Sequence, residues 1–168
     1  TKRYHITLLA ENNTGYQNLM KVSTDAYLKG YYTKPRTDYE FLSEHSEGLI
    51  ATTGCLGGPV LQCLLDGDLD GGIKAAAHLQ DIFGKENLFV EIMNHGIPDQ
   101  MRTNPLLMHV AKTIDAPLLV TNDCHYTHAA DAIPHDVLLC CQTGALQHDT
   151  DRFRFESDQH YLKTAEEM

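Results

Sequence analysis

The sequence predicts an α/β fold in which parallel strands are joined by helices. Three short apolar runs, each typical of a buried strand, occur at residues 49–53, 88–92 and 118–122. Segments with apolar residues at helical spacing separate them, and this alternation is typical of parallel strands with crossover helices. The pattern fits either an open doubly wound sheet or part of a barrel, and it does not choose between them.

The first elements are an apolar stretch at residues 6–10 and a helix that follows it. Residues 12–14 supply N-cap side chains, and the helix is expected to end near Gly30. A second, shorter helix is expected after Asp38, with Gly48 ending it before the first buried strand. In the first helix, apolar and small residues recur at helical spacing: Tyr16, Leu19, Met20, Ser23, Ala26 and Tyr27.

Four later helices are expected between and after the strands. They lie at residues 59–65, from about 68 to 83, around 106–114 and around 137–141. We expect the second of them to be interrupted at Gly71 and Gly72, because glycine weakens a helix interior. The polar segment at residues 147–159 is expected to be less regular.

The composition indicates a globular chain of about one domain. Of 168 residues, 42% are hydrophobic, which is enough to bury a core. Asp and Glu outnumber Lys and Arg by 23 to 13, for a net charge of −10. This balance disfavours nucleic-acid binding by this piece alone, because a duplex attracts basic patches.

The cysteine pattern and the apolar runs bear on the compartment. The five cysteines form no CxxC pair, so a disulfide framework is not expected. There is no apolar run long enough for a membrane span and no signal peptide, so we expect a cytoplasmic location. Because the chain opens on Thr1 and runs almost at once into an apolar stretch, we interpret it as a fragment.

Groups that bind metal or move protons follow all three predicted strands, at the end where parallel sheets bind ligands. Cys55 follows the first strand, Glu91 and His95 lie at and after the second, and Asp123 and His125 follow the third. Because Asp123 and His125 are two residues apart, extended backbone points both side chains to one side. A carboxylate beside an imidazole suits Zn, Mn or Fe.

Each of these residues also has an ordinary structural interpretation. A cysteine after a strand is more often a small buried residue than a ligand, and Asp123 can cap a turn. Spacing alone assigns His5 a structural role, because it precedes an apolar stretch rather than following one. A further alternative is a cysteine nucleophile at Cys55 with His95 or His125 as its base. Phosphate-binding loops and serine-nucleophile motifs are absent.

Several strings of the sequence are recognisable together. They are HITLLAENNTGY at 5–16, GLIATTGCLGG at 48–58, APLLVTNDCHY at 116–126, HDVLLC at 135–140 and YLK at 161–163. In this order they resemble the later part of the PHP (polymerase and histidinol phosphatase) domain of bacterial DNA polymerase III alpha subunits. The resemblance extends over essentially the whole chain and is more specific than one short motif.

The resemblance implies that the fold is part of a distorted seven-stranded (β/α) barrel of PHP type. Residues 1–142 would be a partial PHP domain without its N-terminal H-x-H segment, and residues 143–168 would connect toward the polymerase palm. Matched position by position, the family's metal ligands correspond to His5, Cys55, Asp123 and His125. This replaces the structural interpretation of His5, and Glu91 and His95 are expected to support the ligands. No H-x-H occurs in the sequence, so we expect an incomplete metal site.

The resemblance also implies a function. The parent would be a DNA-directed DNA polymerase of DNA replication, a nucleotidyltransferase whose PHP domain has metal-dependent 3′–5′ exonuclease character. The divalent metal would be Zn, Mn or Mg, and this chain alone is expected to be inactive. The implied partners are DNA, the sliding clamp, the clamp loader and an exonuclease subunit, with no membrane.

Two alternatives remain open. In the first, the domain is a structural and subunit-docking part of the replicase without activity of its own. In the second, ranked lower, the chain is a metal-dependent phosphoesterase of the histidinol phosphatase type. Such an enzyme shares the barrel chemistry but lacks the long polymerase-like strings.

Overall fold

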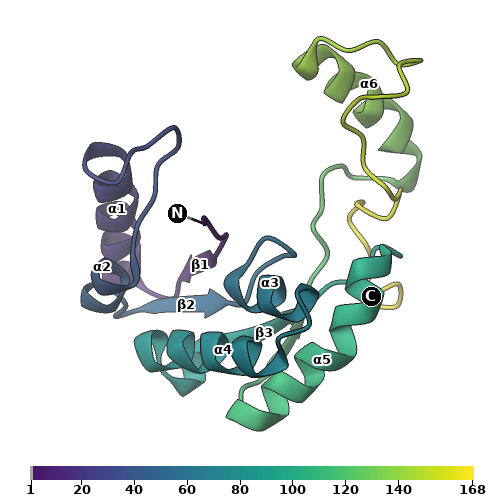
Figure 1. The fold of residues 1–168 in the computed structure, drawn as a ribbon. Helices are drawn as coiled ribbons and strands as arrows, with labels where there is room; N and C mark the ends of the chain where they lie inside the picture. Colours follow the sequence, from purple (N-terminus) through teal and green to yellow (C-terminus); the bar gives the residue numbers. More distant parts are fainter. Residues whose placement is uncertain (1) are drawn as a thin grey trace. The chain divides into compact units, whose positions relative to one another are not determined.

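The computed structural model describes residues 2–168, which form a mixed α/β fold (Figure 1). These residues form two compact units. The first unit runs to Glu91 and includes Pro105–Leu119. The second comprises Ile92–Asn104 and Val120–Met168.

The sheet confirms the three predicted strands. β1 (Thr7–Ala10), β2 (Leu49–Thr52), β3 (Leu88–Ile92) and β4 (Leu118–Val120) form one sheet in the order β1-β2-β3-β4. β2 and β3 are parallel, as the alternation of strands and helices predicts. β1 pairs antiparallel with β2, so the sheet is mixed. The described residues therefore show an α/β fold with a four-stranded sheet.

Helices of the first unit pack beside this sheet. α1 (Asn13–Leu28) contacts β1 and β2, and α2 (Tyr39–Glu44) contacts α4. α3 (Pro59–Leu65) packs on α4 (Leu69–Phe83), which lies along β2 in Figure 1. The expected interruption of α4 is wrong. Gly71 and Gly72 lie in its first turn, where the Asp68 carboxylate accepts a hydrogen bond from the Gly71 amide at 2.8 Å.

The remaining helices follow β3 and β4. The short 3-10 helix η1 (Lys85–Asn87) leads into β3, and α5 (Pro98–Ile114) begins earlier than its apolar face indicated. η2 (Ala129–Asp131) precedes α6 (Ala132–Thr143), which confirms the last predicted helix. The segment after α6 contains no further helix among the described residues, as its polar composition indicated.

α1 begins where the sequence predicts, but its buried face is different. The Asn12 side chain accepts a hydrogen bond from the Gly15 amide at 3.0 Å, which caps the helix. The helix buries Gly15, Asn18, Val22 and Ala26. Of the periodic positions expected from the sequence, four are exposed: Tyr16, Met20, Ser23 and Tyr27. Apolar spacing alone identified the helix but not the side that packs on the sheet.

A close backbone contact places α1 on the turn before β2. A Cβ added at Gly15 would lie 1.7 Å from the Gly48 carbonyl oxygen, so only glycine fits there. The same carbonyl accepts a hydrogen bond from the Glu11 amide at 2.9 Å. The core of the first unit is aliphatic, with fully buried Leu49, Leu64, Leu79, Leu88, Val90, Leu107 and Val110.

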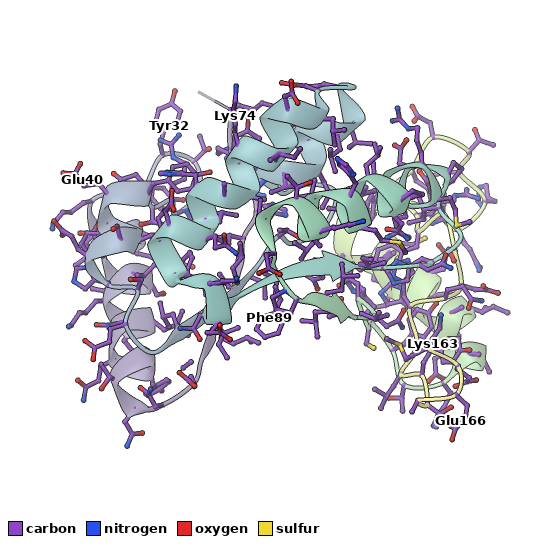
Figure 2. All side chains as sticks on the ribbon, turned by 90° about the horizontal axis from the view of Figure 1, so that it is seen from below. Tyr32, Glu40, Lys74, Phe89, Lys163 and Glu166 are labelled. Carbon is purple, nitrogen blue, oxygen red and sulfur yellow. The ribbon has the colours of Figure 1, made fainter. Side chains whose placement is uncertain are left out.

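Charged side chains lie on the surface of both units. Glu40, Lys74 and Glu166 are exposed and point outward in Figure 2. All five cysteines are free thiols. Within the described part of the chain, no helix is both long and apolar enough to cross a membrane.

Candidate metal centre

In the second unit, the loop after β4 is fastened to the C-terminal segment. The Asn122 side-chain amide donates hydrogen bonds to two backbone carbonyls, Gln159 at 3.1 Å and Tyr161 at 2.6 Å. The His125 amide donates to the His160 carbonyl at 2.8 Å, and Tyr126 forms a parallel bridge with Tyr161. These contacts hold His160 next to the residues that follow β4.

Asp123, His125 and His160 form the one cluster of three or more potential metal ligands found among the described residues. Their ligand atoms lie within 4.8 Å of one another. The His125 Nε2 is 3.3 Å from a carboxylate oxygen of Asp123. Asp123 and His125 are exposed, whereas His160 is buried. The group is therefore open to solvent on one side and anchored on the other.

The geometry of His160 leaves a nitrogen available for metal. Its Nδ1 lies 3.1 Å from the Asp123 carbonyl oxygen, which can only accept a hydrogen bond. Nδ1 therefore carries the proton, and Nε2 keeps its lone pair. Burial lowers the pKa of His160, which favours the neutral, ligating form of the ring. One carboxylate and two imidazoles fit a first-row divalent ion and leave positions for water or substrate.

Aromatic side chains pack against the cluster of Asp123, His125 and His160. The Phe155 ring meets His125 and His160 edge to face, with centroids 4.6 Å apart in both cases. His135 lies 4.9 Å from the same ring. These rings limit the ways in which His125 and His160 can turn, because displaced rings would lose packing on Phe155.

His95 stacks on His160, with ring centroids 4.2 Å apart. The Gln100 side chain fixes its orientation, since its oxygen accepts from the His95 amide at 2.8 Å and its nitrogen donates to His95 Nδ1 at 2.9 Å. His95 therefore carries its proton on Nε2, and that nitrogen offers a donor rather than a metal ligand. Burial, followed by the neighbouring His160, lowers the pKa of His95.

In the first unit, His5 and Cys55 lie together. His5 Nδ1 is 3.7 Å from Cys55 Sγ, and the His5 amide donates to the Gly57 carbonyl at 2.9 Å. Glu91 is buried in the same unit, where its carboxylate accepts a hydrogen bond from the Thr52 hydroxyl at 2.5 Å. Within the first unit, the imidazole beside Cys55 is that of His5.

The structure thus sorts the expected site residues into two groups. It brings Asp123 and His125 together in the second unit, and His5 and Cys55 together in the first. Sequence reasoning missed His160, which lies in an irregular segment 35 residues beyond His125. The available signal was Asp158, which lies two residues before His160 and repeats the spacing of Asp123 and His125. The long-range hydrogen bonds of Asn122 and His125 are what bring His160 to Asp123 and His125.

Comparisons with known proteins identify the family. The PHP domain model matches residues 1–95. The chain is 44% identical over 165 residues to the DNA polymerase III subunit alpha of Deinococcus radiodurans, 45% over 168 residues to that of Thermus aquaticus and 41% over 165 residues to that of Treponema pallidum. Each match covers 98% of this chain, and the chain spans only 12% to 14% of the length of these relatives. The chain belongs to the PHP domain family.

Proposed function

We propose that this chain is the later part of the PHP domain of a DNA polymerase III alpha subunit, and that this domain removes 3′-terminal nucleotides from DNA as a metal-dependent 3′–5′ exonuclease. The observation that carries the proposal is the cluster of Asp123, His125 and His160, in a chain 41% to 45% identical to proteins of that name. A cytoplasmic location and a role in DNA replication belong to the same proposal.

A divalent metal ion held by this cluster would supply an activated water and polarise the scissile phosphodiester. The chain's own residues hold and shape the site. Asp123 contributes charge that favours a cation, and the imidazoles of His125 and His160 contribute nitrogen donors. Two nitrogen donors favour Zn or Mn over Mg, which prefers oxygen ligands.

The proposal also includes His5 and Cys55 as a second pair of metal ligands. Their nitrogen and sulfur atoms suit Zn. In the whole domain, the four strands described above would belong to a seven-stranded barrel, with residues 1–142 in the PHP domain and 143–168 leading toward the palm. The ligand set of the family begins upstream of this chain, so we expect the isolated chain to be inactive. DNA, the sliding clamp, the clamp loader and an exonuclease subunit are the proposed partners.

The test is nuclease activity of the full-length protein on a 3′-mismatched primer, with Asp123→Asn compared to Asp66→Asn. Asp66 is an exposed carboxylate of the first unit that lies outside the cluster, and it serves as the matched control. The proposal predicts that Asp123→Asn loses metal-dependent cleavage while its fold, followed by circular dichroism, stays intact. Equal cleavage by both variants would contradict it.

One observation favours the docking alternative. Four large apolar side chains of α1 are exposed, Tyr16, Met20, Tyr27 and Leu28, and exposed apolar side chains that gather on one element mark interaction surfaces. If the full-length protein shows no metal-dependent cleavage, and Asp123→Asn lowers only its stability, the scaffold function is favoured instead.

A further inference from the structure

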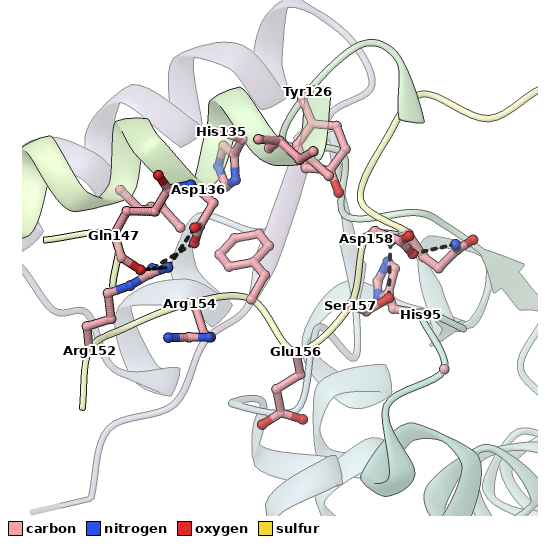
Figure 3. A pocket seen from close by; sticks show the side chains of 16 residues that line it. His95, Tyr126, His135, Asp136, Gln147, Arg152, Arg154, Glu156, Ser157 and Asp158 are labelled. Atoms are coloured by element: carbon pink, nitrogen blue, oxygen red, sulfur yellow. Dashed lines mark hydrogen bonds and ion pairs between the residues drawn. The ribbon is translucent and has the colours of Figure 1, made fainter. Parts of the chain in front are cut away.

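A pocket in the second unit collects buried polar atoms that have no partner. In the described residues, three buried side-chain atoms lack a hydrogen bond: His95 Nε2, Tyr126 Oη and Arg152 Nε. All three residues line the same cavity of about 690 Å³, shown in Figure 3. A buried polar atom without a partner is costly, so three of them around one cavity point to a ligand that pairs with them.

The unpaired atoms are donors. His95 is 2% exposed and carries its proton on Nε2, because Gln100 donates to its Nδ1. The Arg152 side chain is 4% exposed, and its Nε can only donate. The Tyr126 hydroxyl can also donate. The complementary ligand therefore presents hydrogen-bond acceptors in more than one place.

The charges around the pocket show that it is not built for an anion. The Arg152 guanidinium is neutralised by Asp136 through two hydrogen bonds of 2.7 and 2.6 Å. The lining also contains Arg154, Glu156 and Asp158, all exposed, so its acidic side chains outnumber its basic ones by three to two. An uncharged ligand with acceptor atoms fits this balance better than a phosphate does.

The pocket shares a wall with the metal cluster. His95 lines the pocket and stacks on His160 of the cluster, and Phe155 lines the pocket while its ring packs on His160. In Figure 3, Arg152 lies on the side of the pocket opposite His95. The ligand therefore extends from a point beside the cluster toward Arg152.

We propose that this pocket binds the base and sugar of the 3′-terminal nucleotide while its phosphate lies at the cluster. The inference rests on the proposed exonuclease function and adds the substrate group that the protein recognises. Every nucleobase offers carbonyl or ring-nitrogen acceptors and a flat face for aromatic side chains, and arginine donates readily to such acceptors. Tyr126 and His135 supply aromatic rings along one wall.

The first arm of the test is the kinetics of the full-length protein on two DNA primers, one with an intact 3′-terminal nucleotide and one whose terminal sugar lacks its base. The pocket predicts that kcat/KM is higher for the intact terminus. Tyr126→Phe removes one hydroxyl and lowers kcat/KM on the intact terminus about two- to tenfold. The matched control is Tyr31→Phe, which loses an exposed hydroxyl in the first unit and leaves kcat/KM unchanged. Equal cleavage of both primers, or equal behaviour of both variants, overturns the inference.

The second arm decides the inference even if no cleavage occurs. 5-Iodo-2′-deoxyuridine, a nucleoside without a phosphate, is photo-crosslinked to the full-length protein in the presence of a chelator, and the labelled peptides are mapped. Label on peptides that contain Tyr126 or Phe155 supports the pocket. Label confined to other peptides overturns it. If the protein shows no cleavage but is labelled at these residues, the exonuclease proposal is contradicted and the nucleoside pocket is still supported.

Discussion

The side chain of Asn122 is predicted to govern metal affinity although it is not itself a ligand. Its amide donates to the carbonyls of Gln159 and Tyr161, the residues on either side of His160. Each hydrogen bond contributes about 0.5–1.5 kcal/mol, so Asn122→Ala removes about 1–3 kcal/mol that holds His160 in place. If Asn122→Ala destabilises the metal-bound arrangement of the cluster by this amount and leaves the metal-free protein unaffected, metal affinity falls by about 5- to 150-fold.

Metal affinity is measured on the full-length protein by competition with a chelating indicator, using Mn²⁺ and Zn²⁺ separately. Asn122→Asp is expected to bind metal more weakly than Asn122→Ala does, because a carboxylate then faces two carbonyl oxygens. Asn18→Ala is the matched control, since Asn18 also donates to a backbone carbonyl, that of Glu47 at 2.9 Å, but in the first unit. Wild-type affinity in Asn122→Ala would refute the role assigned to these two hydrogen bonds.

Two further predictions concern stability. Gly15→Ala places a Cβ 1.7 Å from the Gly48 carbonyl oxygen, so the steric cost of about 1–3 kcal/mol exceeds the gain of up to about 1 kcal/mol in helix propensity. Hydrogen exchange of the α1 peptides should accelerate in Gly15→Ala but not in Ser23→Ala on the same helix, and slower exchange in Gly15→Ala would count against the close contact. The Arg152 guanidinium holds the pKa of the Asp136 carboxyl below its usual range. The ion pair therefore stabilises the fold fully at pH values above the ordinary carboxyl pKa, and this stabilisation is lost as the pH falls through the lowered pKa. The difference in proteolytic resistance between wild type and Asp136→Asn should therefore be constant above about pH 5 and narrow in more acidic solution; a gap that widens on acidification would show that the sign is wrong.

The fold was predictable where the signal is local. The runs that became β2, β3 and β4 are short, apolar and bounded by turn residues, and the caps at Asn12 and Asp38 mark helix starts. The buried side of α1 was not predictable from hydrophobicity. Gly15 and Asn18 lie on that side because they contact the backbone of the turn at Glu47 and Gly48. The antiparallel pairing of β1 depends on the same tertiary contacts.

The site was predictable in part for a similar reason. Asp123 and His125 are two residues apart after a strand, which is a local pattern. His160 comes from a segment without secondary-structure periodicity, and hydrogen bonds from Asn122 and His125 bring it to the cluster. His5 and Cys55 lie together because the His5 amide donates a hydrogen bond to the Gly57 carbonyl in the loop that contains Cys55. No spacing within the sequence predicts this contact.

The most direct test of the central claim, that the cluster binds a divalent metal, is the metal content of the purified full-length protein. Elemental analysis after dialysis without chelator compares wild type, Asp123→Asn and the Asp66→Asn control. The account predicts that Asp123→Asn holds at least one metal equivalent less than the other two. If Asp123→Asn folds normally and retains the full wild-type metal content, Asp123 is not a ligand and the cluster is not the metal centre.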